Sequence, residues 1–127
     1  MEMLATYIRD CGHHPVMTAG EERQLVKRMA CGDEVARDRL ICGNLRLVMR
    51  IAKSYAKGSD PLYMDLIAEG NVGLLVAADR YEHERGTRFS TYSAIWIRQR
   101  IRKALYELGR YRKRHTELEQ LVGNCET

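Results

Sequence analysis

Apolar residues recur at spacings of three and four along most of the chain, which is the period of a helix rather than of a strand. The first predicted helix covers residues 2–11 and ends at Gly12. A second opens at Thr18, which together with Glu21 fits a capping box, and ends near residues 31–32. The pattern leaves little room for strands, and we predict an all-α fold.

The middle of the chain predicts two longer helices. One begins at Asp33 or Glu34 and runs to about Ala56, where a lysine and a glycine follow. The next covers residues 61–80, because Pro61 suits the first position of a helix. It holds two glycines, Gly70 and Gly73, which cost roughly 1 kcal/mol each against alanine inside a helix. The close approach of another helix is the usual compensation.

The last predicted helix follows a polar loop over residues 81–88. Ser90 is a good N-cap candidate, and the helix runs to about Leu108. Gly109 weakens its continuation into the tail. We therefore predict a compact bundle of four to five helices over residues 1–115, with residues 116–127 as a tail that is helical or disordered.

One face of this last helix combines flat rings with an amide and lies beside cations. Tyr92, Ile95, Trp96 and Gln99 share that face at spacings of three and four. Rings stack on unpaired bases, an amide reads a base edge, and neighbouring cations hold phosphates. The alternative is an ordinary amphipathic helix whose aromatic residues belong to the core and whose cations form a solvated face.

Composition and charge narrow the class of protein. A chain of 127 residues, 45% hydrophobic and 30% charged, can form one core without staples. Its apolar runs are too short to span a bilayer, and its four cysteines lack metal-ligand spacing, so we expect a cytoplasmic protein without membrane, metal or cofactor. The sequence has no paired carboxylates, Ser-His-Asp set or phosphate-binding loop, so we expect that the protein is not an enzyme.

Residues 80–115 carry eleven Arg or Lys and three acids, a local charge of +8 that favours binding to nucleic acid.

Several motifs, in order and at compatible spacing, resemble sigma factors of bacterial RNA polymerase of the sigma-70 family. The resemblance covers about residues 4–110 and rests on these segments: Tyr7 to Gly12 and Thr18 to Arg28 (similar to region 1.2), Asn44 to Tyr55, Asp65-Leu66-Ile67-Ala68-Glu69-Gly70-Asn71-Val72-Gly73-Leu74, Arg85-Gly86-Thr87-Arg88-Phe89-Ser90-Thr91-Tyr92, and Trp96-Ile97-Arg98-Gln99. It implies a domain of the sigma region 1.2 and region 2 type.

The resemblance implies two binding surfaces. In the family, the helix with the Asp-Leu-Ile-x-Glu-Gly-Asn motif docks on the clamp helices of the polymerase β′ subunit, which implies contacts from Asp65, Leu66, Glu69, Asn71, Leu74 and Leu75. This docking would also give the twin glycines a packing reason. The aromatic-basic helix in the family recognises and opens the promoter −10 element on the non-template strand, which implies a DNA surface of Asn44, Leu47, Glu82, Arg85, Arg88, Phe89, Thr91, Tyr92, Trp96, Gln99, Arg102 and Lys103.

Within that DNA surface the resemblance implies separate roles. A flipped adenine would meet Glu82, Arg85, Thr91, Tyr92, Trp96 and Gln99, and a second flipped base would meet Asn44, Leu47 and Val16. Gln99, Arg102 and Lys103 would face the upstream duplex edge.

Three departures from the primary members of the family affect this reading. Ala68 stands where they usually have glutamine, which removes a polar contact to the polymerase. Ile95 replaces the first of two adjacent tryptophans, and Thr87 replaces an aromatic residue. Both of the latter changes remove stacking surface used in strand opening, so we interpret the chain as an alternative rather than a housekeeping factor.

Other interpretations stay open at this point. The chain is either an excised domain of a longer factor or a minimal factor that relies on a helper for −35 contacts, and its start at Met1 slightly favours the second. An anti-sigma partner is compatible with either. A decoy that binds core polymerase without opening promoters is the main alternative function, and a generic basic DNA-binding helical protein is the third.

Overall fold

The computed structural model describes residues 17–57, 60–82 and 86–126, and every regular element in these ranges is an α-helix. The described helices are α2 (Ala19–Ala30), α3 (Glu34–Cys42), α4 (Leu45–Lys53), α5 (Leu62–Arg80) and α6 (Phe89–Glu126). The prediction of an all-α bundle is confirmed. The helix predicted for residues 2–11 lies outside the described residues.

Side-chain caps begin the first two described helices. The backbone N–H of Glu21 donates to the Thr18 hydroxyl at 3.2 Å, as the capping-box pattern predicts. At the start of α3, Asp33 accepts from the Ala36 N–H at 3.1 Å and from Arg28 Nε at 2.9 Å. These donors, the backbone N–H first, lower the pKa of Asp33 below its ordinary value because they stabilise the carboxylate.

The single long helix predicted for residues 33–56 is wrong, because the chain breaks between α3 and α4. The Asn44 side chain donates from Nδ2 to the Leu40 carbonyl at 2.8 Å, in a buried position. The Asn44 backbone N–H meanwhile bonds to the Ile41 carbonyl at 3.0 Å, one residue short of the helical partner. A side-chain amide that competes with the backbone in this way ends a helix.

The pair of glycines in α5 admits the neighbouring helices. A Cβ added at Gly73 would lie 2.7 Å from the Trp96 carbonyl oxygen of α6, and one at Gly70 would lie 2.7 Å from Val48 Cγ1 of α4. Close helix approach is therefore confirmed as the reason for both glycines. The approach is internal, however, because both residues are buried. Their attribution to polymerase docking is wrong.

The last helix starts two residues earlier and extends further than predicted. It begins at Phe89 rather than after an N-cap at Ser90, and it continues through Gly109 to Glu126 over 38 residues. The Ser90 N–H bonds to a side chain of another helix, Glu22 Oε1 at 3.2 Å. This long-range acceptor takes the role that sequence reasoning gave to the Ser90 hydroxyl.

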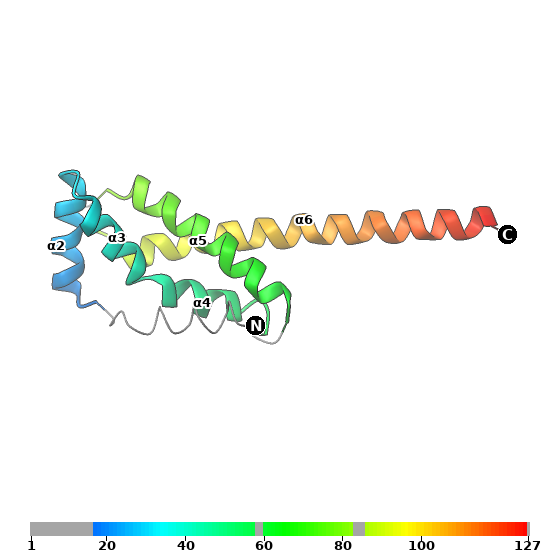
Figure 1. Ribbon diagram of the computed structural model, residues 1–127, viewed down its shortest axis with the longest axis horizontal. Coiled ribbons are helices and arrows are strands. Elements are labelled where there is room, and N and C mark those ends of the chain that lie inside the picture. The colour runs from blue at the N-terminus through cyan, green and yellow to red at the C-terminus, as the bar shows by residue number, and fades with distance from the viewer. Residues whose placement is uncertain (1–16, 58–59, 83–85, 127) are drawn as a thin grey trace.

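The helices pack around a core between α4, α5 and the first half of α6 (Figure 1). In the figure α5 lies beside the first half of α6. Helices α2 and α3 lie at one end of the bundle, and the second half of α6 extends beyond the other end. The largest fully buried side chains are Tyr63, Phe89, Leu40, Leu66, Ile67, Leu74, Ile97, Ile101, Val48 and Ser93. This packing places the end of α5 against the start of α6, where the candidate site lies.

Candidate nucleic-acid interface

An open cleft of about 670 Å³ lies where α5 ends and α6 begins. It is lined by the last residues of α5, the segment that follows, and one face of α6, namely Asp79, Arg80, Tyr81, Glu82, Thr87, Tyr92, Ile95 and Trp96. The helical spacing of three and four places the α6 residues on the same side, as predicted. We call this space the aromatic cleft.

Aromatic rings form a continuous row beside the cleft. The Tyr81 ring lies 5.3 Å from the Phe89 ring and 5.5 Å from the Tyr92 ring, and Tyr92 lies 6.3 Å from Trp96, between ring centroids. The Arg80 guanidinium lies 5.2 Å from the Trp96 centroid, a cation–π distance. Tyr92 and Trp96 are half-buried, so each ring has one part in the bundle and another in the cleft.

The cleft brings together only some of the residues predicted for the flipped adenine. Glu82, Tyr92 and Trp96 line it, whereas Arg85 lies outside the described residues. Thr91 and Gln99 are exposed on α6 but are not among the lining residues.

Phe89 requires a correction as a DNA contact. Its side chain has no exposed surface, and it packs edge-on against the Tyr81 ring. A fully buried side chain cannot touch a nucleic acid, so Phe89 supports the cleft from inside the core. The sequence could not separate Phe89 from Tyr92, because both rings belong to one helical turn.

A second, smaller cleft of about 220 Å³ lies between α4 and the start of α6. Its lining includes Asn44 and Leu47, the two described residues predicted for a second base, while Val16 lies outside the described residues. The lining also includes three arginines, Arg46, Arg50 and Arg88. The Asn44 amide nitrogen donates one hydrogen to Leu40, which leaves its second N–H and its side-chain oxygen for a ligand.

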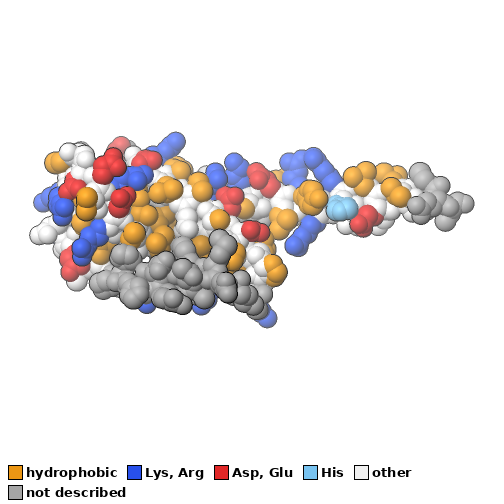
Figure 2. Space-filling model, viewed as in Figure 1, with side chains coloured by type: hydrophobic (Ala, Val, Ile, Leu, Met, Phe, Trp, Pro, Cys, Tyr) orange, Lys and Arg blue, Asp and Glu red, His pale blue; other side chains and the backbone are white. Residues whose placement is uncertain are grey.

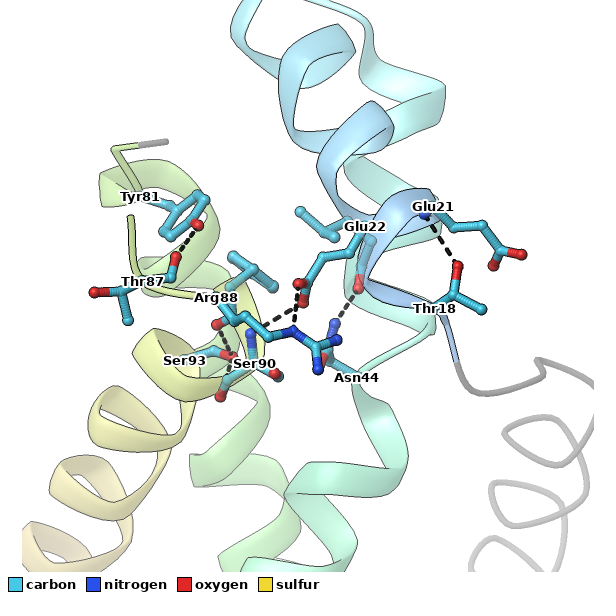
Figure 3. A network of polar contacts seen from close by, with 11 residues as sticks. Thr18, Glu21, Glu22, Asn44, Tyr81, Thr87, Arg88, Ser90 and Ser93 are labelled. Atoms are coloured by element: carbon cyan, nitrogen blue, oxygen red, sulfur yellow. Dashed lines mark hydrogen bonds and ion pairs between the residues drawn. The ribbon is translucent and has the colours of Figure 1, made fainter. Parts of the chain in front are cut away.

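Glu22 lines the smaller cleft and bonds the start of α6, and sequence reasoning missed it. Its side chain is buried and accepts from Arg88 Nε at 3.0 Å and from the Ser90 N–H at 3.2 Å (Figure 3). Burial and the negative charge of Glu22 together raise the pKa of Tyr81. The Tyr81 hydroxyl donates to the Thr87 carbonyl, which ties the end of α5 to the segment before α6.

A sequence signal for Glu22 existed. The residue stands three, four and seven positions before Leu25, Val26 and Met29, so it occupies the apolar stripe of α2. An acid in such a stripe must meet a donor when the stripe is buried. The identity of that donor, on a helix 68 residues away, could be known only from the fold.

Cations continue along α6 beyond the clefts. Arg102, Lys103 and Gln99 are exposed, in agreement with their predicted place on a surface. Arg102 Nε donates to the Tyr55 hydroxyl at 2.9 Å, which holds that guanidinium near the end of α4. Figure 2 shows Lys and Arg side chains spaced along the part of α6 that leaves the bundle.

The predicted polymerase-binding residues of α5 divide between surface and core. Leu66 and Leu74 are 1% and 0% exposed, so these two are corrected to core residues that cannot make direct contact. The exposed positions of α5 form a stripe at spacings of three and four: Asp65, Ala68, Val72, Leu75 and Asp79. Glu69 and Asn71 are half-buried beside that stripe. Glu69 pairs with Arg100 of α6 at 3.1 Å.

Two further findings concern other kinds of site. Within the described ranges, no group of three or more His, Cys, Asp or Glu side chains is arranged to hold a metal ion, and Cys31 and Cys42 are free. Of the helices described, none is both long and apolar enough to cross a membrane.

Comparison with known proteins identifies the family. Residues 40–115 match the family described as Sigma-70 region 2. The chain is 45% identical over 104 residues to the RNA polymerase sigma factor SigA of Bacillus sp, which covers 82% of this chain and 27% of the relative. It is also 45% identical over 104 residues to the RNA polymerase sigma factor RpoS of Coxiella burnetii (strain RSA 493 / Nine Mile phase I), with 82% of this chain and 29% of the relative covered. The chain thus spans less than a third of the length of these relatives, and it belongs to the sigma-70 family through its region 2.

Proposed function

We propose that this chain acts in transcription initiation, by binding core RNA polymerase through α5 and the unpaired −10 strand of a promoter through the aromatic cleft. The observation that carries the proposal is the cleft itself, in which Tyr92 and Trp96 present ring surface beside Arg80. Such a site suits a single-stranded base better than a duplex, because a base must leave its stack before it can lie on a ring.

Stacking on the cleft offsets the cost of strand opening. Flipping a base out of a duplex costs a few kcal/mol, and stacking it on an aromatic side chain returns about 1–3 kcal/mol. The exposed cations of α6, Arg98, Arg102 and Lys103, lie on the same helix as Tyr92 and Trp96 and would hold the adjacent phosphates. Because the rings and the cations lie on one rigid helix, the distance between the site for the base and the site for the phosphates of the DNA strand is fixed.

The second cleft suits a second base of the same strand. Arg46 and Arg50 supply positive charge for a phosphate, and the Asn44 side-chain oxygen can accept from a base edge. Arg88 lines this cleft while it is paired with Glu22, so its position is fixed before any ligand arrives. We assign to Arg88 a phosphate contact rather than a base contact.

The polymerase surface of α5 is its exposed stripe. Val72 is 40% exposed and Leu75 is 42% exposed, so apolar area lies in the middle of the stripe, with Asp65 at one end. An apolar centre with charges at its edge is the usual anatomy of a protein interface. By analogy with the family, the partner is the β′ clamp helices, contacted by Asp65, Glu69, Asn71 and Leu75.

Co-purification with core polymerase tests this surface. Leu75→Ala and Glu69→Lys should weaken association with core enzyme by roughly tenfold or more, as truncation of an interface anchor does. Val35→Ala is the matched control, because Val35 is 71% exposed and lies on α3 rather than on α5. Arg100→Ala removes the ion pair with Glu69 but leaves Glu69 in place. If it co-purifies normally while Glu69→Lys does not, the effect of Glu69→Lys comes from a lost polymerase contact. If both α5 variants co-purify normally with core polymerase, the exposed stripe of α5 is not the polymerase-binding surface.

A decoy that binds polymerase without opening promoters is the second candidate function. Ile95, which is 59% exposed at the cleft, supplies no ring there, and Thr87 supplies none on the facing segment. Both positions reduce the area available to stack on the upstream end of a bubble. Run-off transcription from a template with a −10 element distinguishes the two functions, since a decoy gives no transcript.

A further inference from the structure

One apolar seam runs along α6, and only its first part packs inside the chain. Ile97 and Ile101 are fully buried, and both lie close to Gly70 of α5. Alternating steps of four and three residues continue the same seam as follows: Ala104, Leu108, Tyr111, His115, Leu118 and Val122. This alternation is the heptad spacing of helices that pair along their length.

Beyond the bundle the seam has no cover in the described chain. Tyr111, Leu118 and Val122 are 64%, 60% and 56% exposed, and of residues 106–124 only Leu108 is even half-buried. Most helical stability in proteins comes from the packing of an apolar face, and this helical segment has no such packing within the described chain. Gly109 and Gly123 weaken this one further, and neither has a neighbour that an added Cβ would meet. A packing partner would stabilise the segment.

Charge indicates which partner fits. Residues 108–114 carry four Arg or Lys and no acid, whereas residues 115–124 carry two acids, Glu117 and Glu119, and no Arg or Lys. The segment is therefore basic in its first half and acidic in its second. Two copies of it laid side by side in opposite directions place each basic half against an acidic half, and a two-fold axis makes the same contact twice.

We propose that the projecting part of α6 pairs with the same segment of a second copy, antiparallel, about a two-fold axis between residues 116 and 117. In this register Tyr111 meets Val122 of the second copy, and His115 meets its Leu118. Arg112 then flanks Glu119 of the second copy. The uncovered seam spans only about 20 Å of helix, so association is weak, with half-dimerisation at roughly 10–100 µM chain.

Sedimentation of the full chain against concentration tests the pairing. The wild-type chain should shift from monomer to dimer, and Leu118→Lys should weaken this association by roughly tenfold or more, because it places a charge in the seam. Gln120→Lys adds the same charge on the outer side of the helix and should behave as the wild type. A wild-type chain that stays monomeric over this range, or equal effects of the two lysines, would overturn the proposal.

Cross-linking tests the direction. When Tyr111→Cys and Val122→Cys chains are mixed and oxidised, the antiparallel register predicts disulfides that join residue 111 of one chain to residue 122 of the other, identified by peptide mass spectrometry. Each variant alone should give no more dimer than the wild type, which controls for the native cysteines. Disulfides that join residue 122 to residue 122 would instead indicate parallel pairing and overturn the antiparallel arrangement.

Discussion

Gly73 and Gly109 both lie inside helices, but their surroundings differ. At Gly73 an added Cβ would lie 2.7 Å from the Trp96 carbonyl oxygen, a backbone atom that cannot move aside without the helix. At Gly109 an added Cβ meets nothing within 4 Å. The same residue type therefore marks close packing in α5 and open space in α6.

Alanine at these two positions should change stability in opposite directions. Gly73→Ala should lower the free energy of unfolding by about 1–3 kcal/mol or more, because α5 and α6 must separate. Gly109→Ala should raise it by up to about 1 kcal/mol, because alanine is the better helix former. Thermal unfolding followed by circular dichroism measures both. If Gly73→Ala left the free energy of unfolding unchanged, the two helices would not approach each other so closely.

Ile95 provides a test of strand opening that leaves the core unchanged. Its side chain is 59% exposed, so Ile95→Trp should not alter the unfolding temperature. The added ring enlarges the stacking surface of the cleft and should make promoter opening easier, worth about 1–3 kcal/mol for one stacked base. Permanganate reactivity of −10 thymines in the presence of core polymerase measures opening. If reactivity does not rise, missing stacking area at residue 95 does not limit strand opening.

At this scale the sequence predicted the type of site better than the role of each side chain. Helical spacing correctly placed Tyr92 and Trp96 on one face, and the structure places both at the cleft. It could not show that Phe89 is buried or that Leu66 and Leu74 point inward, because a helix surrounded by neighbours on several sides has no purely polar face. Burial of these residues depends on the placement of the other helices.

Between elements, the contact of α2 with the start of α6 depends on one carboxylate. Glu22 is 6% exposed and bonds both the Ser90 N–H and Arg88 Nε. It therefore holds the first turn of α6, and with it Arg88, at the smaller cleft.

Removal of this carboxylate should destabilise the chain and displace Arg88. Glu22→Ala should lower the free energy of unfolding by about 1–3 kcal/mol, since two donors lose a buried acceptor. Glu21→Ala is the matched control. The Glu21 side chain, next to Glu22 in the sequence, is exposed, and its removal should lower the free energy of unfolding by no more than about 1 kcal/mol. Chemical denaturation compares the two. Equal losses would mean that Glu22 acts only through the charge at the start of α2.

The limits of α3, α4 and α6 show what a one-dimensional pattern omits at the element scale. Helical spacing of apolar residues is present on both sides of residues 43–44, but α3 ends there, where the Asn44 side chain bonds to the Leu40 carbonyl. The tail of α6 has helical periodicity, but the sequence contains no sign of whether a helix projecting from the bundle persists. Gly109 weakened the prediction of a continuation that the structure has.

Across the whole molecule, charge and packing separate two surfaces. The exposed stripe of α5 carries Asp65, Val72 and Leu75, whereas the exposed side of α6 carries Arg98, Arg102 and Lys103. The ion pair between Glu69 and Arg100 lies where these helices meet. The stripe of α5 thus has the apolar centre on which the proposed polymerase contact rests, and α6 has the cations on which the proposed nucleic-acid contact rests.

The most direct measurement of the proposed function is the affinity of the chain, assembled with core polymerase, for a single-stranded −10 oligonucleotide and for its duplex. We predict tighter binding of the single strand, and a loss of about 5- to 150-fold in oligonucleotide affinity for Tyr92→Ala. Ser54→Ala, exposed at the end of α4, serves as the control variant. Unfolding temperatures measured in parallel separate loss of the cleft from loss of the fold. Equal affinity for single strand and duplex, or unchanged oligonucleotide binding by a folded Tyr92→Ala chain, would contradict binding of the unpaired −10 strand in the aromatic cleft.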